Sequence, residues 1–347
     1  MNANAGKLLV IGPSWVGDMV MSQVLYRYLQ ETRPGVTIDV LAPAWSEPLL
    51  QRMPEVRSAI PMPVGHGELG LGRRWRLGRS LRSRGYEQAL LLPNSLKSAL
   101  VPLIAGIPRR TGWRGEMRYG LVNDMRLLDE QALPLMVQRF VALAQAPGEA
   151  VPARLPAPRL VADAGQARRC REQLGLAGDR PLLALCPGAE FGGAKRWPAE
   201  RYGELAGRYL ARGWQVALFG SANDRPVTAA IRGHCDDHAA CFDLAGRTRL
   251  AEAVDLLSLA SAVVSNDSGL MHIAAALALP LVAIYGATSP VFTPPLNDNA
   301  ATVVSDIDCA PCFQRECPLG HHRCMRDTPV ERVAAELETL LTGGGRQ

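Results

Sequence analysis

The stretch "VVSNDSGLMHIAAALALPLVAIYG", residues 263–286, decides the fold class. It begins with an apolar run typical of a buried strand, changes at Asn266 to small polar residues, and continues from Gly269 as an Ala- and Leu-rich helical pattern. A second apolar run follows Pro280. Strand, helix and strand in this order predict parallel strands of one sheet, joined by a crossover helix.

The same alternation occurs on both sides of a Pro- and Ala-rich region. "KLLVIG" at 7–12 and "PLLALCPG" at 181–188 are each followed by a helical pattern and a further apolar run. The region at about 144–165 is predicted to be a linker. We therefore expect an α/β protein of two Rossmann-like domains, residues 1–155 and 156–347, which face each other across a cleft. The last helix is a candidate to pack back on the N-terminal domain.

Composition and charge limit the class of protein. Hydrophobic residues make up 48% of the 347 residues, but no apolar run approaches the roughly 18 residues that cross a bilayer. The N-terminus lacks the pattern of a secretory signal, so a cytoplasmic location is expected. Between residues 66 and 126, twelve basic residues stand against four acidic ones. This excess predicts an anionic partner, although a solvated arginine-rich helix face explains part of it equally well.

Polar residues at one predicted strand end form the first candidate site. Asp267, Ser268 and Gly269 begin a helix whose unpaired backbone N–H groups and dipole suit a diphosphate. Taken alone, Asp267 or Ser268 is equally well explained as a helix cap. His272 on the same helix is, by itself, better explained as a packed histidine.

Two further loops at strand ends add charged groups. Lys195, in "CPGAEFGGAKRWPAERY" at 186–202, is placed to meet a phosphate, unless it is an exposed lysine of a flexible loop. Asp18 follows "GPSWVG" at a helix start, where a carboxylate either caps the helix or takes a proton from an attacking hydroxyl. Neither loop carries the P-loop or dinucleotide fingerprint, which weakens ATPase and hydride-transfer alternatives. The pattern predicts a transferase that uses a sugar nucleotide.

The segment "IPRRTGWRGEMRYGL", residues 107–121, is predicted to be a loop that binds an anion or a sugar. Its arginines alternate with aromatic residues, a mixture that suits phosphate, carboxylate or sugar groups. The candidate acceptor contacts are Arg110, Trp113, Arg114 and Arg118. A nucleic acid is not expected as the partner, because the basic block has no recognition motif.

Four segments together resemble the ADP-heptose:lipopolysaccharide heptosyltransferases. They are "GPSWVGDMVMSQ", "PGAEFGGAKRWP", "LAGRTRLAEAVDLL" and "SNDSGLMHIAAALALPLVAIYG", in the family's order and over nearly the whole chain. The resemblance implies a GT-B fold, inversion at the anomeric carbon and no cofactor for catalysis. "RRTGWRGEMRYGLVND" and "CAPCFQRECPLGHHRCM" are similar to the members that add the second heptose of the inner core. The alternatives are a member that adds the first heptose, another GT-B transferase with a different sugar nucleotide, or a non-catalytic protein that binds nucleotide sugars or anionic glycans.

The resemblance also implies residue roles and partners. Asp18 is the general base, and Lys195 neutralises the departing diphosphate. The residues assigned to the donor are Lys195, Asp267, Ser268, Gly269, Leu270 and His272, with Asn223 and Asp224 as weaker candidates near the ribose. The implied partners are ADP-heptose and a lipid A-linked inner-core oligosaccharide, which the enzyme meets in peripheral contact with the cytoplasmic face of the inner membrane.

Four cysteines near the C-terminus have an unusual spacing. Cys309, Cys312, Cys317 and Cys324 form C-x2-C-x4-C-x6-C, with two histidines in the last gap. The spacing is compatible with a structural zinc or iron–sulfur site, and equally with reduced thiols in a surface loop.

Overall fold

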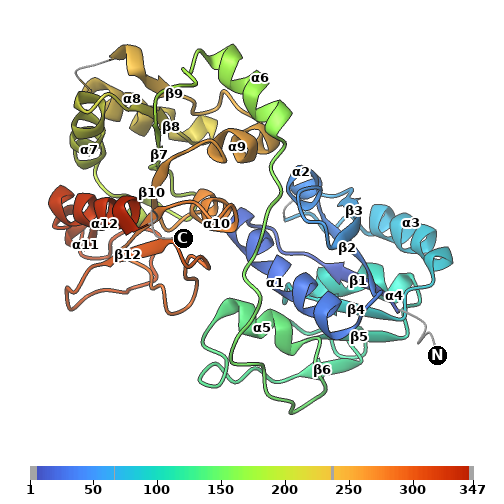
Figure 1. Ribbon diagram of the computed structural model, residues 1–347. Helices are drawn as coiled ribbons and strands as arrows, with labels where there is room; N and C mark the ends of the chain where they lie inside the picture. The colour runs from blue at the N-terminus through green and yellow to red at the C-terminus, as the bar shows by residue number, and fades with distance from the viewer. Residues whose placement is uncertain (1–5, 66, 236–237, 344–347) are drawn as a thin grey trace. The chain divides into compact units, whose positions relative to one another are not determined.

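The computed structural model describes residues 6–65, 67–235 and 238–343 (Figure 1). The chain divides into two compact units, Met1–Pro158 and Arg159–Gln347. This division falls inside the predicted linker.

The first unit contains a six-stranded sheet in the order β3-β2-β1-β4-β5-β6, in which all paired strands are parallel. The strands are β1 Lys7–Ile11, β2 Thr37–Pro43, β3 Val56–Met62, β4 Gln88–Leu91, β5 Arg109–Trp113 and β6 Asp124–Arg126. The central strands are almost entirely apolar because helices cover both faces of the sheet. The helices are α1 Val16–Thr32, α2 Glu47–Leu50, α3 Leu71–Leu81, α4 Leu100–Ile104 and α5 Met136–Ala142, with short 3₁₀ turns η1 Ala44–Ser46, η2 Arg82–Arg84 and η3 Leu96–Ala99.

The second unit repeats this architecture with the order β12-β11-β10-β7-β8-β9, again parallel throughout. The strands are β7 Leu182–Cys186, β8 Gln215–Leu218, β9 Cys241–Asp243, β10 Ala262–Asn266, β11 Leu281–Tyr285 and β12 Ala300–Val304. The helices are α6 Ala164–Leu174, α7 Ala199–Ala211, α8 Arg225–Gly233, α9 Leu250–Leu257, α10 Gly269–Ala276, α11 Arg323–Arg326 and α12 Val330–Gly343, with 3₁₀ turns η4 Gly193–Lys195, η5 Ala222–Asp224 and η6 His238–Ala240.

Both sheets have the Rossmann strand order when their strands are numbered within each unit, 3-2-1-4-5-6. The predicted α/β class with two Rossmann-like units is confirmed. In this topology the strand order reverses between β1 and β4 in the first unit, and between β7 and β10 in the second. Ligands of such sheets bind outside the carboxyl ends of the strands at that reversal. The loops that follow these four strands are therefore the candidate ligand-binding loops.

The C-terminal helix α12 packs inside its own unit. It contacts β11, β12 and α7, and its buried residues Val330, Val333 and Leu337 join the core under that face of the sheet (Figure 1). Across the described ranges, no helix combines the length and hydropathy that a membrane span requires.

One sequence interpretation is wrong in part. The segment 107–121 was predicted to be a loop, but its first half is the strand β5, paired with β4 at Leu90 and Thr111. Thr111, Gly112 and Trp113 are buried, because this strand lies between β4 and β6 in the sheet. Only residues after Trp113 leave the sheet as a loop.

Candidate functional site

The loops after β7 and β10 bring together the two charged residues predicted for the donor site. Lys195 Nζ lies 2.6 Å from Asp267 Oδ2, and the two side chains are 13% and 6% exposed. The aromatic ring of Phe191 lies under the same ammonium group, 4.8 Å from its centroid. Lys195 is therefore held at a fixed position, and the interpretation as a lysine of a flexible loop does not apply.

A hydrogen-bond network fixes the loop geometry around Asp267. Thr288 Oγ1 donates to Asp267 Oδ2 at 2.6 Å. The neighbouring Asn266 is fully buried: its Oδ1 accepts from the Trp197 backbone N–H at 3.1 Å and the Tyr202 hydroxyl at 3.0 Å, and its Nδ2 donates to the Pro187 carbonyl at 2.7 Å. Asn266 thus ties the loop after β7 to the end of β10.

The start of α10 resolves the question of the helix cap. Ser268 is the N-cap and its hydroxyl accepts from the Met271 N–H, whereas the Asp267 carboxylate is turned to Lys195. Gly269 and Leu270 are the first helical residues, so their N–H groups are among those without a helical acceptor. His272 is 5% exposed, and burial lowers its pKa from 6.5 to about 4, so the imidazole is neutral at pH 7.

The Lys195 loop rests on the cysteine-rich segment, which sequence reasoning missed. The Ala194 N–H donates to the Arg315 carbonyl at 3.0 Å, and the Gly193 N–H donates to Glu316 Oε1 at 3.1 Å. A Cβ atom at Gly192 would lie 2.2 Å from the Arg315 carbonyl oxygen, so only glycine permits this approach. No motif in the sequence relates these two distant segments.

The weaker donor candidates lie after β8. Asp224 is buried, and its Oδ2 accepts from both the N–H and the hydroxyl of Ser221 at 2.8 Å in a capping box. Gly188 lies against the same carboxylate so closely that a Cβ atom there would be 2.7 Å from Oδ2. Asn223 is exposed beside it. Asp224 therefore has a structural role in shaping the loop.

The predicted general base lies in the first unit. Asp18 is half-buried in the first turn of α1, directly after the loop that leaves β1. This is the carboxyl end of a strand that borders the reversal of strand order, as the sequence predicted.

The four predicted acceptor contacts differ in what their side chains already bind. Arg118 is fully buried and donates to the carbonyls of Pro93 and Trp113 at 2.7 and 2.6 Å. Arg110 donates to the carbonyls of Leu121 and Ile107, and the Trp113 indole donates to the Arg139 carbonyl. The side chain of Arg114 is exposed. Arg110, Trp113 and Arg118 thus hold the loop after β5, while Arg114 is presented on it.

The C-terminal cysteines are free thiols that lie near one another. Burial raises the pKa of Cys324, and the nearby Cys309, Cys312 and Cys317 raise it further. The pKa of Cys317 is lowered because backbone N–H groups, that of His322 foremost, point at its sulfur. Within the part of the chain that the structure describes, no three His, Cys, Asp or Glu side chains are arranged to hold a metal ion.

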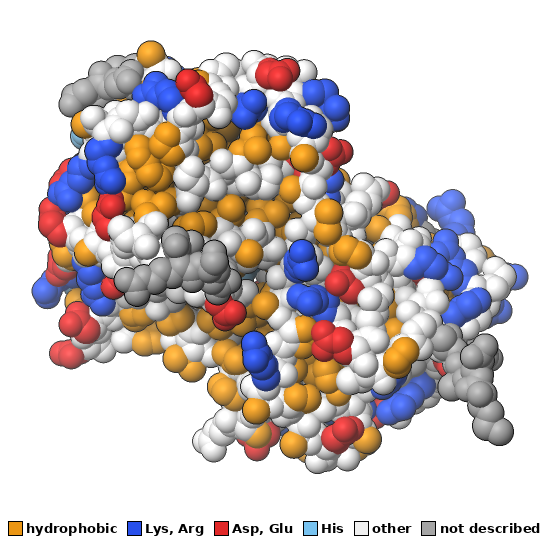
Figure 2. Space-filling view, in the orientation of Figure 1, with side chains coloured by type: hydrophobic (Ala, Val, Ile, Leu, Met, Phe, Trp, Pro, Cys, Tyr) orange, Lys and Arg blue, Asp and Glu red, His pale blue; other side chains and the backbone are white. Residues whose placement is uncertain are grey.

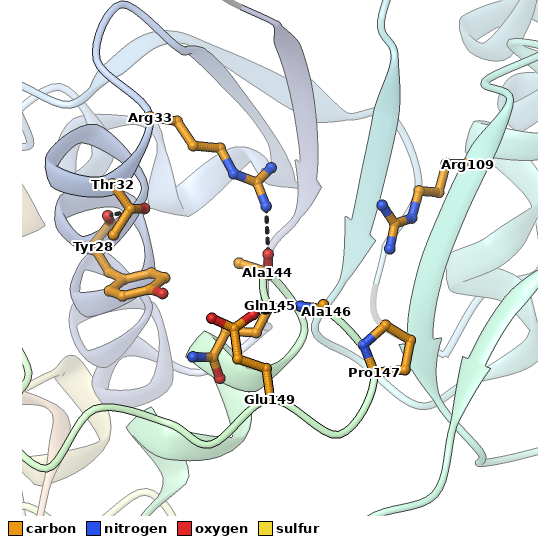
Figure 3. A pocket seen from close by; sticks show the side chains of 9 residues that line it. All are labelled: Tyr28, Thr32, Arg33, Arg109, Ala144, Gln145, Ala146, Pro147 and Glu149. Carbon is orange, nitrogen blue, oxygen red and sulfur yellow. Dashed lines mark hydrogen bonds between the residues drawn. The ribbon is translucent and has the colours of Figure 1, made fainter.

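A pocket of about 550 Å³ lies at the opposite end of α1 from Asp18 (Figure 3). Tyr28 and Arg33, from the end of that helix, line it with Arg109, Gln145 and neighbouring residues. At a rise of about 1.5 Å per residue, Tyr28 is about 15 Å along the helix from Asp18. This pocket is therefore distinct from the loops that carry the predicted site.

Two Rossmann-like units, with charged loops at their strand reversals, are the architecture of the GT-B class of glycosyltransferases. The model of glycosyltransferase family 9 (heptosyltransferase) matches residues 74–323, and the chain belongs to this family. It is 52% identical to lipopolysaccharide heptosyltransferase 2 of Escherichia coli, over 96% of this chain and 98% of that protein. It is 48% identical to lipooligosaccharide heptosyltransferase 2 of Haemophilus influenzae, over 96% of this chain and 99% of that protein. The structure of E. coli ADP-heptose lps heptosyltransferase II is similar, with a TM-score of 0.88 and 50% identity, covering 98% of this chain and 99% of that one.

Proposed function

We propose that this enzyme transfers L-glycero-D-manno-heptose from ADP-heptose to the first heptose of the lipopolysaccharide inner core. The supporting observation is the buried pair of Lys195 and Asp267 beside the start of α10, where a lysine, free N–H groups and a carboxylate meet. The first two suit a diphosphate, and the carboxylate suits sugar hydroxyls. The relatives that are about half identical are named lipopolysaccharide or lipooligosaccharide heptosyltransferase 2, which supports a heptose as the transferred sugar and the second heptose as the one added.

The proposed reaction is a single displacement with inversion. The acceptor hydroxyl oxygen forms a bond to the anomeric carbon as the bond from that carbon to the diphosphate oxygen breaks. Asp18 takes the hydroxyl proton, and ADP leaves with the electron pair of the broken bond.

The donor residues act on the charge that develops on the leaving group. Lys195 exchanges part of its interaction with Asp267 for the diphosphate, while the N–H groups of Gly269 and Leu270 bind the same group. Neutral His272 then serves as a hydrogen-bonding group rather than a second cation. Asp267, relieved of part of its ion pair, accepts hydrogen bonds from the heptose.

On the acceptor side, we assign direct contact to Arg114 and a positioning role to Arg118, because Arg118 is fully buried and bound to backbone carbonyls. The acceptor is the lipid A-linked oligosaccharide at the cytoplasmic face of the inner membrane, where the enzyme binds peripherally. Asn223 and Asp224 line the proposed ribose end of the donor site.

A separate proposal concerns the C-terminal cysteines: their spacing and the proximity of Cys309, Cys312 and Cys317 to Cys324 support a structural zinc or iron–sulfur site, whose ligands would have to move from the arrangement described above. Elemental analysis of the purified full-length protein tests it. One zinc per chain, or iron with acid-labile sulfide, supports the proposal, and a chain without either overturns it.

A mass-spectrometric transfer assay tests the proposed function. ADP-heptose is offered with an acceptor that has one inner-core heptose and, in parallel, with one that has none. One heptose added only to the former is the expected result. Addition only to the heptose-free acceptor would assign the first-heptose reaction instead, and binding of ADP-heptose without transfer would favour a non-catalytic binding protein.

A further inference from the structure

The helix α3 has one side firmly attached to the first unit. Arg74, Gly78 and Leu81 are buried on that side. A Cβ atom at Gly78 would lie 2.7 Å from two carbons of Ile104, so the helix approaches α4 as closely as a glycine allows. Packing against α4 thus sets the position of α3 in the first unit, and it determines which side of the helix faces away from that unit.

That opposite side combines exposed apolar residues with arginines. Leu71 is 58% exposed and Trp75 50% exposed, and Leu69 just before the helix is 49% exposed. Leu71, Trp75 and Arg79 are spaced four residues apart, so they form one row along the helix. The Arg79 guanidinium lies 4.8 Å from the centroid of the Trp75 ring.

Acidic residues outside this helix balance only part of its arginine charge: Arg73 pairs with Glu68, and Arg84, in the turn after the helix, pairs with Asp39. Between residues 71 and 84 the sequence has six arginines and no aspartate or glutamate. Arg73, Arg76 and Arg79 are exposed within α3. Figure 2 shows Lys and Arg side chains gathered over the part of the surface where α3 lies.

A buried arginine holds the apolar residues at the start of the helix outward. Arg74 Nε donates to the Leu69 carbonyl at 2.7 Å, and its two other nitrogens donate to the carbonyls of Glu68 and Lys97 at 3.3 Å. These bonds fix the backbone on which Leu69 and Leu71 stand. The exposure of Leu69 and Leu71 therefore follows from the hydrogen bonds of Arg74 to the backbone.

We propose that the exposed face of α3, formed by Leu69, Leu71, Trp75, Arg76 and Arg79, docks on a bilayer that contains anionic phospholipids. Aliphatic residues and a tryptophan beside arginines are the composition of an interfacial helix, whose apolar side enters the boundary between headgroups and acyl chains. The arginines meet the lipid phosphates. A nucleic acid would use the arginines but would leave the exposed leucines without a partner.

This proposal rests on the proposed function, since a lipid-anchored acceptor requires the enzyme to work at a membrane surface. The new element is the surface that contacts the membrane, namely the exposed face of α3. The proposed function assigns acceptor contact to the loop after β5, and no residue of α3 is assigned to catalysis or to substrate binding.

Binding to vesicles tests the proposal with the full-length protein. Wild type is sedimented with vesicles of phosphatidylethanolamine and phosphatidylglycerol, and with vesicles of phosphatidylcholine alone. Arg76→Gln with Arg79→Gln is expected to weaken binding to the anionic vesicles roughly thirtyfold, at about fivefold per arginine. The matched control, Arg168→Gln with Arg169→Gln on α6, removes two exposed helical arginines of the second unit and should change binding less than about twofold.

A second variant tests the orientation of the helix. Brominated acyl chains quench a tryptophan that enters the bilayer, so wild-type fluorescence should fall on binding. Trp75→Leu keeps an apolar side chain and should still bind, but most of the quenching should be lost. Unchanged quenching would overturn the proposal, as would failure of wild type to bind anionic vesicles or equal binding by the α3 variant and its control.

Transfer to a deacylated, water-soluble acceptor separates this proposal from the proposed function. The α3 variants should transfer heptose to that acceptor at the wild-type rate. Normal transfer without vesicle binding would refute the docking surface alone. Vesicle binding through α3 without heptose transfer by wild type would instead refute the proposed function.

Discussion

Replacing Lys195 with glutamine is expected to reduce both stability and turnover, for different reasons. The Lys195 ammonium is 2.6 Å from Asp267, and both side chains are largely buried. Removing one partner of such a pair leaves an uncompensated buried carboxylate, which costs about 3–5 kcal/mol. For a unit of this size the melting temperature should fall by roughly 10 °C.

The effect on turnover has a separate origin. Loss of a charged group that stabilises a developing anion typically lowers kcat about 100- to 1000-fold. An assay of ADP release at saturating substrate concentrations measures the loss of kcat, and thermal unfolding measures the loss of stability. Lys195→Arg keeps the positive charge and should retain more of both properties than Lys195→Gln.

The double variant Lys195→Gln with Asp267→Asn distinguishes the two roles. The amide at position 267 carries no charge to leave unpaired, so the double variant should recover most of the lost stability. Thr288 can still donate its hydrogen bond to the amide oxygen. Turnover should stay low, because the charge that acts on the diphosphate is still missing. Recovery of turnover together with stability would refute a direct role of Lys195 in the reaction.

Three further variants probe other parts of the site. Asp18→Asn should lower kcat about 100- to 10,000-fold with donor affinity kept, by rapid-quench turnover and calorimetric titration, and unchanged turnover would remove the base assignment. His272 has a pKa of about 4 in the folded protein and an ordinary value of 6.5, so the unfolded chain binds the proton first as the pH falls. The free energy of unfolding should therefore decrease between pH 6.5 and pH 4, by about 2 kcal/mol at pH 5. Urea unfolding of His272→Gln should show a weaker dependence on pH than wild type, and an identical dependence would show that His272 is not its source. Gly192→Ala should lower kcat at least about tenfold, because the added methyl group pushes the Lys195 loop away from the Arg315 carbonyl. The control Gly207→Ala, at an open position within α7, should leave kcat unchanged. Equal kcat values for the two variants would show that the contact with Arg315 does not position the loop.

The inner strands could be predicted from the sequence, but the edge strands could not. β1, β4, β7 and β10 are short apolar runs, because both faces of the sheet bury their side chains. β3 has only one buried residue, Ile60, and its pattern is mixed. Edge strands have solvent on one side, so their sequence carries a weaker signal. The strand β5 escaped prediction for another reason, since arginines and a glycine obscure its pattern.

The candidate site shows the same division between local and distant information. Lys195 and Asp267 could be expected near each other because strand ends meet at one edge of a parallel sheet. Their ion pair could not, because the path of the loop depends on Asn266 and on Arg315, which are remote in sequence. Arg118 was expected to face a ligand, yet it satisfies backbone carbonyls that local patterns do not reveal.

The repeated strand order has a consequence for dissecting the enzyme. Each unit completes its own sheet, and neither sheet borrows a strand from the other. The chain can therefore be interrupted near Pro158 without cutting a sheet or dividing a hydrophobic core. Residues 159–347 carry every group proposed for the donor, and residues 1–158 carry the proposed base and the acceptor loop. The groups proposed for nucleotide recognition and for proton transfer are thus encoded in separate lengths of gene, which recombination can exchange one at a time.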